Sequence, residues 1–350
     1  MSKNTDRVVG FDVGDRRIEV CVVSLGSGDV LAREKVATRR DVLEPWLAAA
    51  PCSRIVMETG THAPWIARAA EAAGHEVIVA DARTVELITK SSKKTDRRDA
   101  EMLARLGRSD QALLRPVHVR SQTTQRQRAL LRMRDALVRA RAQQINCARG
   151  VMKTEGLPLE SCGSEAFARR VRETVHASWR GALEPLLGAV DALSEQIRAY
   201  DAMLEAIAER DHAPAIARVS QPDGVGTLTA LALVLAVEDP RRFKNGREMS
   251  AYLGLVPRRR QSGESDPNLG ISKEGDVYAR RLLVSAAHYV LERGPDSDLK
   301  RWGLALEARW GPKTRKRAAV AVARKLAVLL WRLWIDGRQY EPLRHAVAAA

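Results

Sequence analysis

The chain has 350 residues, a formal net charge of +15 and an isoelectric point near 10.1. This length allows two domains with cores of their own. The net charge of +8 in each of the ranges 101–150 and 301–350 favours a polyanionic partner, either nucleic acid or an anionic membrane surface. The sequence contains no run of eighteen apolar residues and no apolar signal segment, and its four cysteines show neither disulfide nor zinc spacing. We therefore expect a cytoplasmic protein without a membrane span.

The first third of the chain alternates short apolar runs with helix-like segments. Strands are expected at residues 8–14, 18–24, 30–36, 53–58 and 75–82. Helices are expected at residues 40–49, 64–73 and 84–110. Turn-like residues separate the first three strands, which predicts a meander. The alternation of helices and strands that follows predicts an α/β domain with a mixed sheet.

The middle of the chain predicts two long helices. Residues 121–153 are rich in Arg, Gln, Ala and Leu and contain no proline, which is typical of one long basic helix. A second helix over residues 183–210 carries a heptad seam, with alternate spacings of four and three, formed by Leu186, Val190, Leu193, Ile197, Tyr200, Leu204 and Ile207. An intramolecular helical hairpin and a dimer interface would satisfy this seam equally well, so both interpretations stay open.

Four carboxylates have positions suited to a metal site. Asp12 lies in the first expected strand, and Glu58 ends the fourth. Asp96 and Asp99, three residues apart, would share one helix face. Phosphodiester cleavage and transfer commonly use two divalent ions, and Mg²⁺ prefers carboxylate oxygens as ligands. Because the same spacing is common on solvated helix faces, the spacing alone does not distinguish a metal site from a charged surface.

Three clusters of Lys and Arg have the charge to contact phosphate groups. They are Lys93, Lys94, Arg97 and Arg98; Arg258, Arg259 and Arg260; and Lys313, Arg315, Lys316 and Arg317. Each can equally be a solvated face, and the last cluster begins an apolar helix that could also lie on a membrane surface. The turn Asp223-Gly224-Val225-Gly226 opens another apolar helix, where it either holds a phosphate or simply connects two elements.

An ordered series of motifs covers most of the chain. It consists of GFDVG at residues 10–14, METG at 57–60 and KTDRRDA at 94–100, followed by PDGVG, DPRRF, YLGLVP, QSGES and ISKEGD. In this order the motifs resemble the insertion sequence 110 family of bacterial transposases, and the series is far more specific than any one motif. The resemblance implies an N-terminal DEDD domain with an RNase H-like fold, similar to the Holliday-junction resolvase RuvC, and a C-terminal transposase domain.

The same resemblance implies roles for individual residues. The DEDD carboxylates, which would be catalytic and hold one or two Mg²⁺ ions, would be Asp12, Glu58, Asp96 and Asp99. Ser262 in QSGES would be the nucleophile that forms a covalent phosphoserine intermediate with DNA, with Ser265 as the competing candidate. A noncoding RNA would bridge donor and target DNA by base pairing. In one departure, Pro222-Asp223-Gly224 carries one residue more than the glycine turn of the family, which leaves the geometry of that turn open.

Together, the residues and the resemblance predict an α/β plus mainly α protein. A RuvC-like domain is expected at residues 1–112, a helical coiled-coil segment at 113–212 and a mainly helical transposase domain at 213–350. The predicted function is that of a DNA transposase or recombinase, which cuts and rejoins element ends and target DNA at the bacterial nucleoid as a guide-RNA-bound dimer or tetramer. Two alternatives remain, a RuvC-like junction nuclease that uses metal-bound water and a noncatalytic nucleic-acid-binding protein.

Overall fold

The computed structural model describes residues 5–83, 85, 95–261, 263, 267, 269–311 and 314–344. The chain divides into two compact units, Met1–Ser121 and Gln122–Ala350, and each has hydrophobic cores of its own. The three-part division expected from the sequence stays a prediction. None of the helices in the described ranges is both long enough and apolar enough to cross a bilayer.

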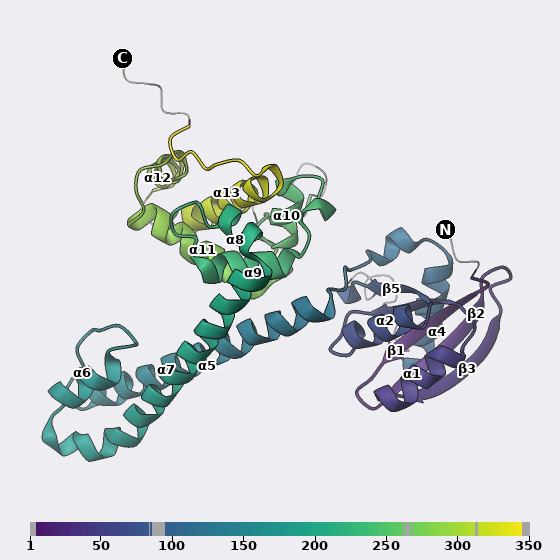
Figure 1. The fold of residues 1–350 in the computed structure, drawn as a ribbon, viewed down its shortest axis with the longest axis horizontal. Helices are drawn as coiled ribbons and strands as arrows, with labels where there is room; N and C mark the ends of the chain where they lie inside the picture. The colour runs from purple at the N-terminus through teal and green to yellow at the C-terminus, as the bar shows by residue number, and fades with distance from the viewer. Residues whose placement is uncertain are drawn as a thin grey trace. The chain divides into compact units, whose positions relative to one another are not determined.

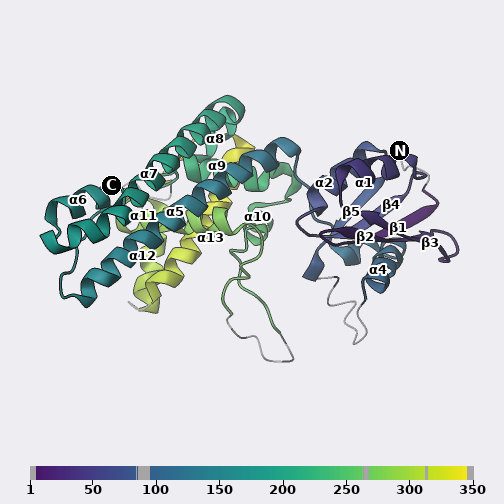
Figure 2. The same cartoon turned by 90° about the horizontal axis from the view of Figure 1, so that it is seen from below.

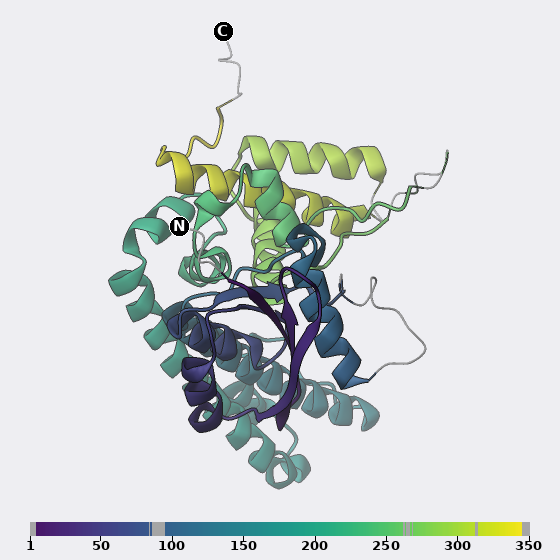
Figure 3. The same cartoon turned by 90° about the vertical axis from the view of Figure 1, so that its right-hand side faces the viewer.

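The first unit is built on a five-stranded mixed sheet. Its strands are β1 (Arg7–Val13), β2 (Arg17–Ser24), β3 (Val30–Ala37), β4 (Arg54–Glu58) and β5 (Glu76–Ala80). They lie in the order β3-β2-β1-β4-β5. Figure 3 shows this twisted sheet, in purple and blue, with helices on either side of it. The β1–β2 and β2–β3 pairs are antiparallel, and the β1–β4 and β4–β5 pairs are parallel. The five expected strands, the meander and the mixed sheet are therefore confirmed.

Helices cover both faces of this sheet (Figure 2). They are α1 (Arg40–Ala49), α2 (Ala63–Ala72), α4 (Asp96–Arg108) and the short 3-10 helix η1 (Gln111–Leu114). On the α1 and α2 face, Phe11 and Met57 are fully buried. On the α4 face, Val8 and Val56 pack against Leu103. Because side chains alternate between the faces of a strand, burial on both faces makes β1 apolar over four consecutive positions.

Two glycines allow α4 to approach the sheet closely. A Cβ atom on Gly10 would lie 1.9 Å from the carbonyl oxygen of Ala100, and one on Gly107 would lie 2.3 Å from Cγ2 of Val56 and 3.3 Å from Cγ1 of Val8. The start of α4 is thus beside the later residues of β1, and its end is beside the earlier ones. The helix therefore runs antiparallel to β1, and its first turn extends toward the carboxyl end of that strand.

The second unit begins with a long helical hairpin (Figure 1). Its helices are α5 (Gln122–Thr154), α6 (Phe167–Thr174) and α7 (Ala177–Asp211). The two long helices expected from the sequence are confirmed. The second begins earlier than expected, because the side chain of His176 accepts a hydrogen bond from the backbone N–H of Ser178 and caps α7 there.

The heptad seam of α7 packs against α5. Leu204 and Ile207 share a core with Leu131 of α5, and Val190 shares another with Ile145 of α5. Of the expected seam residues, the buried ones are Val190, Ile197, Leu204 and Ile207. The half-buried ones are Leu186, Leu193 and Tyr200. Since the partner of the seam lies in the same chain, the structure supports the hairpin interpretation rather than a dimer interface built on this seam.

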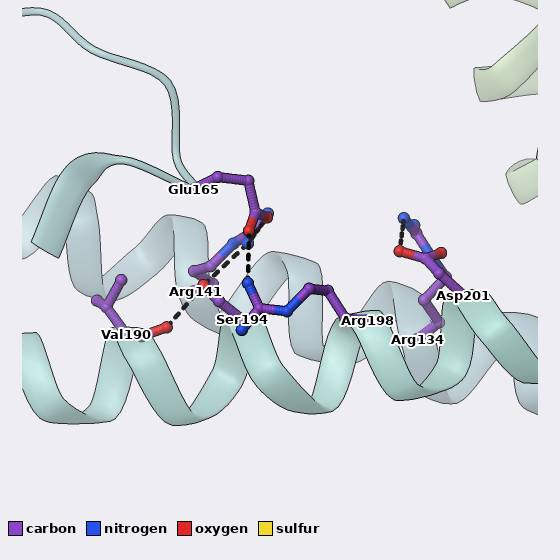
Figure 4. A network of polar contacts seen from close by, with 7 residues as sticks. All are labelled: Arg134, Arg141, Glu165, Val190, Ser194, Arg198 and Asp201. Atoms are coloured by element: carbon purple, nitrogen blue, oxygen red, sulfur yellow. Dashed lines mark hydrogen bonds and ion pairs between the residues drawn. The ribbon is translucent and has the colours of Figure 1, made fainter. Parts of the chain in front are cut away.

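Polar contacts also connect the segments of the hairpin (Figure 4). The guanidinium of Arg141 in α5 donates to Oγ of Ser194 in α7 at 3.0 Å and forms an ion pair with Glu165. Closer to the base of the hairpin, Arg134 of α5 forms an ion pair with Asp201 of α7. Arg141 is only 8% exposed. Because a buried guanidinium without partners is costly, these contacts favour one register of the two helices.

A bundle of further helices completes the second unit. They are α8 (Ala213–Val219), α9 (Thr227–Val237), η2 (Pro240–Arg242), α10 (Gly246–Tyr252), α11 (Val277–Glu292), α12 (Asp298–Trp310) and α13 (Arg315–Asp336). Helix α9 is buried continuously over Ala230–Val237, as expected for a helix that is apolar on all sides. The prediction of a mainly helical C-terminal part is confirmed.

Candidate active site

Two of the predicted carboxylates lie on neighbouring parallel strands. The register of β1 and β4 pairs Phe11 with Met57, so Asp12 and Glu58 follow immediately at the carboxyl ends of the two strands. Asp12 has the same strand parity as Gly10, which faces α4. Glu58 has the parity of Val56, which packs in the α4-side core. Both carboxylates therefore belong to the face of the sheet that α4 covers, and both are half-buried.

The other two carboxylates lie in the first turn of α4. The buried stripe of this helix contains Ala100 and Leu103, and Asp96 and Asp99 continue that stripe toward the N-terminus at helical spacing. Asp96 is exposed and Asp99 is half-buried. Because α4 is antiparallel to β1, its first turn points to the end of the sheet where Asp12 lies. The fold thus directs all four carboxylates toward one edge of one face.

The fold does not bring these carboxylates into a complete metal-binding cluster. Among the described His, Cys, Asp and Glu side chains, no three or more lie close enough together to hold a metal ion. The chemistry of the donor set nevertheless fits a hard divalent cation, since carboxylate oxygens are the ligands that Mg²⁺ prefers. The metal centre therefore stays a prediction, for which the structure provides the donor-bearing elements.

Other polar groups at the same end of the sheet were not identified from the sequence. Asp15, just beyond β1, lies 3.4 Å from Nε2 of His62, and Nδ1 of His62 accepts a hydrogen bond from Trp65 (3.1 Å). Asp81 directly follows β5 and pairs with Arg83. The signal in the sequence is their position, because Asp15 comes two residues after β1 and Asp81 comes directly after β5, and both of these strands are parallel to β4.

An ion-pair cluster fastens the side of α4 to the meander. Glu101 pairs with Arg33 of β3 at 2.5 Å and with Arg105 of α4 at 2.8 Å. Hydrogen bonds from Arg33, and then from Arg105, lower the pKa of the Glu101 carboxyl below its ordinary value. Glu101 therefore holds the helix that carries Asp96 and Asp99, and its neighbours Arg97 and Arg98 are exposed on that helix.

The predicted nucleophile belongs to the second unit. Ser262 and its competitor Ser265 lie outside the described residues, whereas Gln261 and Gly263 on either side of Ser262 lie within them. The three arginines that precede this region are exposed: Arg258, Arg259 and Arg260. Their position next to the expected nucleophile agrees with a role in phosphate contact, which stays a prediction.

The base of the serine-bearing segment is fixed by backbone pairing. Pro257 and Ile271 form an antiparallel bridge, and the N–H of Arg258 donates to the carbonyl of Gly270 at 3.0 Å. On the other side of this bridge, farther from Ser262 in the sequence, the N–H of Ser272 donates to the carbonyl of Val256 at 2.8 Å. These bonds hold the two ends of the segment side by side.

A buried arginine and two glycines support that base. The guanidinium of Arg280, which is 8% exposed, donates to the carbonyl of Leu253 at 2.9 Å and to that of Glu274. Gly254 and Gly275 both have positive φ, and a Cβ atom on Gly275 would lie 1.9 Å from the carbonyl oxygen of Tyr252. Side chains at these glycines would thus disrupt the base. In the sequence, Arg280 carries no signal, and Gly254 and Gly275 belong to the motifs YLGLVP and ISKEGD without a role of their own.

The glycine turn has a packing role. Gly224 has φ +86°, and a Cβ atom there would lie 2.8 Å from the ring of Tyr289 in α11. Gly226 is the N-cap residue of α9. Close packing is a sufficient reason for Gly224, so the structure favours the simple connection over a phosphate site at this turn, with the additional residue Asp223 exposed.

The C-terminal basic cluster begins α13. Lys313 lies outside the described residues, as do Lys93 and Lys94 of the first cluster. Arg315 forms an ion pair with Glu292 of α11 at 3.0 Å. Lys316 and Arg317 are exposed and line a large cavity beside α12.

Comparison with known proteins matches both halves of the chain to transposases. The family model for DEDD transposases of IS110, described as "Transposase", matches residues 9–155. A second model, described as "Transposase IS116/IS110/IS902 family", matches residues 217–300. The first match contains the four predicted carboxylates, and the second contains the serine-bearing segment.

Curated relatives agree with the family models. The chain is 34% identical to the "Transposase for insertion sequence element IS1111A" of Coxiella burnetii, over 69% of this chain and 67% of that protein. It is 29% identical to the "Probable family 20 transposase" of Pseudomonas aeruginosa, over 95% and 98% of the two chains. It is 28% identical to the "Transposase for insertion sequence element IS1328" of Yersinia enterocolitica, over 94% and 97%. The chain belongs to the IS110 family of transposases, which makes it an enzyme that acts on DNA.

Proposed function

We propose that this transposase cuts and rejoins the DNA strands of an insertion sequence through a serine nucleophile and a carboxylate-held metal centre. The observation that carries the proposal is the arrangement of β1, β4 and α4, whose topology directs Asp12, Glu58, Asp96 and Asp99 to one edge of the sheet. The nucleophile is Ser262, and the three arginines before it bind the phosphates on either side of the reacting one.

The sheet supports an RNase H-like, RuvC-like classification of the first unit. An antiparallel meander followed by two parallel strands, in the order β3-β2-β1-β4-β5, is the arrangement that the resemblance implies. In this arrangement the first strand is central, and it carries the first carboxylate, Asp12. The second carboxylate, Glu58, comes from the strand beside it.

In the proposed mechanism, Asp12, Glu58, Asp96 and Asp99 would hold one or two Mg²⁺ ions, which would offset the negative charge that develops on the phosphate. The hydroxyl oxygen of Ser262 attacks phosphorus and loses its proton, and the bond from phosphorus to the bridging DNA oxygen breaks. The leaving DNA oxygen takes up a proton and becomes a hydroxyl. Attack by a DNA hydroxyl on the phosphoserine then releases the serine, so the phosphodiester bond is conserved in the rejoined strand.

Two further parts of the proposal concern partners. A noncoding RNA would pair with donor and target DNA and so provide specificity by base pairing. The protein would act as a dimer or tetramer at the bacterial nucleoid, with one copy supplying carboxylates and another the serine for the same strand. Because the seam of α7 is used inside the hairpin, this assembly needs a surface other than the seam. A monomer in sedimentation that retains full strand transfer would contradict the oligomer.

The test is strand exchange by purified protein on DNA that carries the element ends. Ser262→Ala should abolish strand cleavage and rejoining, whereas Ser265→Ala should retain both. A junction nuclease that uses metal-bound water would keep cleaving with Ser262→Ala, and that outcome would overturn the serine mechanism. A noncatalytic binding protein would retain its biological function with Asp12→Asn, whereas the proposed enzyme loses transposition.

A further inference from the structure

A cavity in the second unit has a volume of about 1330 Å³. It lies beside α12 and α13, and its walls include both ends of the serine-bearing segment, at Pro257 and at Leu269–Ile271. Small-molecule sites usually have volumes of about 300–1,000 Å³. A cavity of this size suits an extended ligand better than a small one.

The charge of the cavity wall selects the class of ligand. Eight Lys and Arg side chains line it, against the two carboxylates of Asp298 and Glu341. The cations include Lys316, Arg317 and Arg324, which follow one another along α13. A row of cations along one wall is the arrangement that binds successive phosphates.

Apolar and aromatic side chains also line the cavity. The apolar ones include Leu255, Leu299 and Leu306. Nζ of Lys325 lies 4.1 Å from the centre of the Trp302 ring, so this cation already covers one face of that indole. Trp310, at the end of α12, is 44% exposed and lines the same cavity. Its indole is available for stacking.

We infer that this cavity, which we call the α12–α13 groove, binds an unpaired nucleic-acid strand and leads it to the segment that carries Ser262. Unpaired bases need apolar and aromatic surfaces, while their phosphates need cations, and the groove offers both side by side. In a duplex the bases are paired and stacked inside the helix, so a duplex would contact only the Lys and Arg side chains of the groove and not its aromatic ones. The guiding role rests on the proposed serine mechanism, whereas the binding role does not.

Single-stranded RNA and single-stranded DNA share the chemistry that the groove would recognise. Binding is therefore measured by fluorescence anisotropy of the full-length protein with labelled strands of about 12 nucleotides. One strand is RNA, one is DNA of the same sequence, and a duplex DNA of that sequence is the third ligand. Whichever single strand loses more affinity in the groove variants is the preferred occupant.

Two variants and one matched control test the groove. Trp310→Ala should weaken single-strand binding at least about fivefold, because base stacking on an aromatic side chain is lost, and should change duplex binding by less than about twofold. Arg324→Gln should reduce the slope of log affinity against log salt by about 0.7, the value for one phosphate contact of a single strand. Arg309→Gln removes the same charge from α12 outside the cavity lining and should leave single-strand affinity near that of the wild type.

Equal affinities of the wild type, Trp310→Ala and Arg324→Gln for both single strands would overturn the inference. So would an equal loss of single-strand and duplex binding by Trp310→Ala. Covalent attachment of DNA at Ser262 is measured in the same samples, because it reports on the proposed function independently. Groove variants that bind normally while the wild type forms the adduct contradict the groove alone, and a wild type that binds single strands but forms no adduct contradicts the serine mechanism alone.

Discussion

The two sets of proposed reacting groups rest on different kinds of structure. Asp12 and Glu58 lie on strands whose positions are fixed by hydrogen bonds along their whole length and by buried cores on both faces. The segment that carries Ser262 is fixed at its base by one bridge, a few backbone hydrogen bonds and the buried Arg280. The carboxylates thus depend on the packing of a whole domain, whereas the contacts described for the serine-bearing segment hold its two ends.

The carboxylate side of this comparison predicts the largest effect. Asp12→Asn keeps the shape of the side chain and removes its negative charge, so strand cleavage should fall at least about a hundredfold if Asp12 is a metal ligand. The melting temperature should stay near that of the wild type. Asp41→Asn, on the exposed surface of α1 in the same unit, is the matched control and should retain activity. Cleavage by Asp12→Asn at the rate of the wild type would contradict the metal centre.

The next largest effect is expected at the base of the serine-bearing segment, where a substitution should lower the free energy of unfolding. Arg280→Met removes the buried guanidinium that donates to the carbonyls of Leu253 and Glu274, which should cost about 2–4 kcal/mol in the free energy of unfolding. Chemical denaturation measures this cost. Arg293→Met, one residue beyond the same helix and exposed, should cost less than about 0.5 kcal/mol. Equal stability of the two variants would show that Arg280 does not hold the base.

The contact of α4 with the sheet should respond to a single methyl group. In Gly10→Ala the new Cβ would overlap the backbone of α4, so the helix must shift, at a cost of about 1–3 kcal/mol. The rate of strand cleavage should fall by more than the loss of folded protein explains, because the shift of the helix moves both Asp96 and Asp99. Gly60→Ala, where a Cβ would meet nothing within 4 Å, is the control. Strand cleavage by Gly10→Ala at the rate of the wild type would contradict a role of α4 in the reaction.

The smallest expected effect concerns the ion pairs of α4. Glu101→Gln should destabilise the protein by about 1 kcal/mol at neutral pH, because the neutral amide cannot form ion pairs with Arg33 and Arg105. The folded state lowers the pKa of Glu101, so this stabilisation is present above the ordinary carboxyl pKa of 4.5 and is lost as the pH falls below it. Glu44→Gln, in the more exposed pair with Arg40, is the control.

The stability difference between the wild type and Glu101→Gln should therefore disappear in acid. Urea denaturation at neutral pH and at a pH well below 4.5, beneath the lowered pKa of the folded state, measures it. A difference of the same size at both values would mean that the contribution of Glu101 does not come from its charge.

Regular periodicity explains which features were predictable from the sequence. The strands around Asp12 and Glu58 and the two long helices follow patterns of two and of three to four residues, so their existence could be predicted. The partner of the α7 seam could not, because a heptad pattern does not identify which helix it meets. The roles of Arg280 and Gly275 could not be predicted, because they depend on contacts with backbone groups that no sequence pattern identifies. The resemblance, rather than periodicity, singled out Ser262.

The proposed serine mechanism is tested most directly by mapping the covalent attachment between the protein and element-end DNA by mass spectrometry of the isolated peptide. We expect attachment at Ser262 in the wild type, no attachment in Ser262→Ala, and strongly reduced attachment in Asp12→Asn. Attachment at another residue, or full attachment at Ser262 when Asp12 is replaced, would contradict the claim that the serine and the carboxylates serve one reaction.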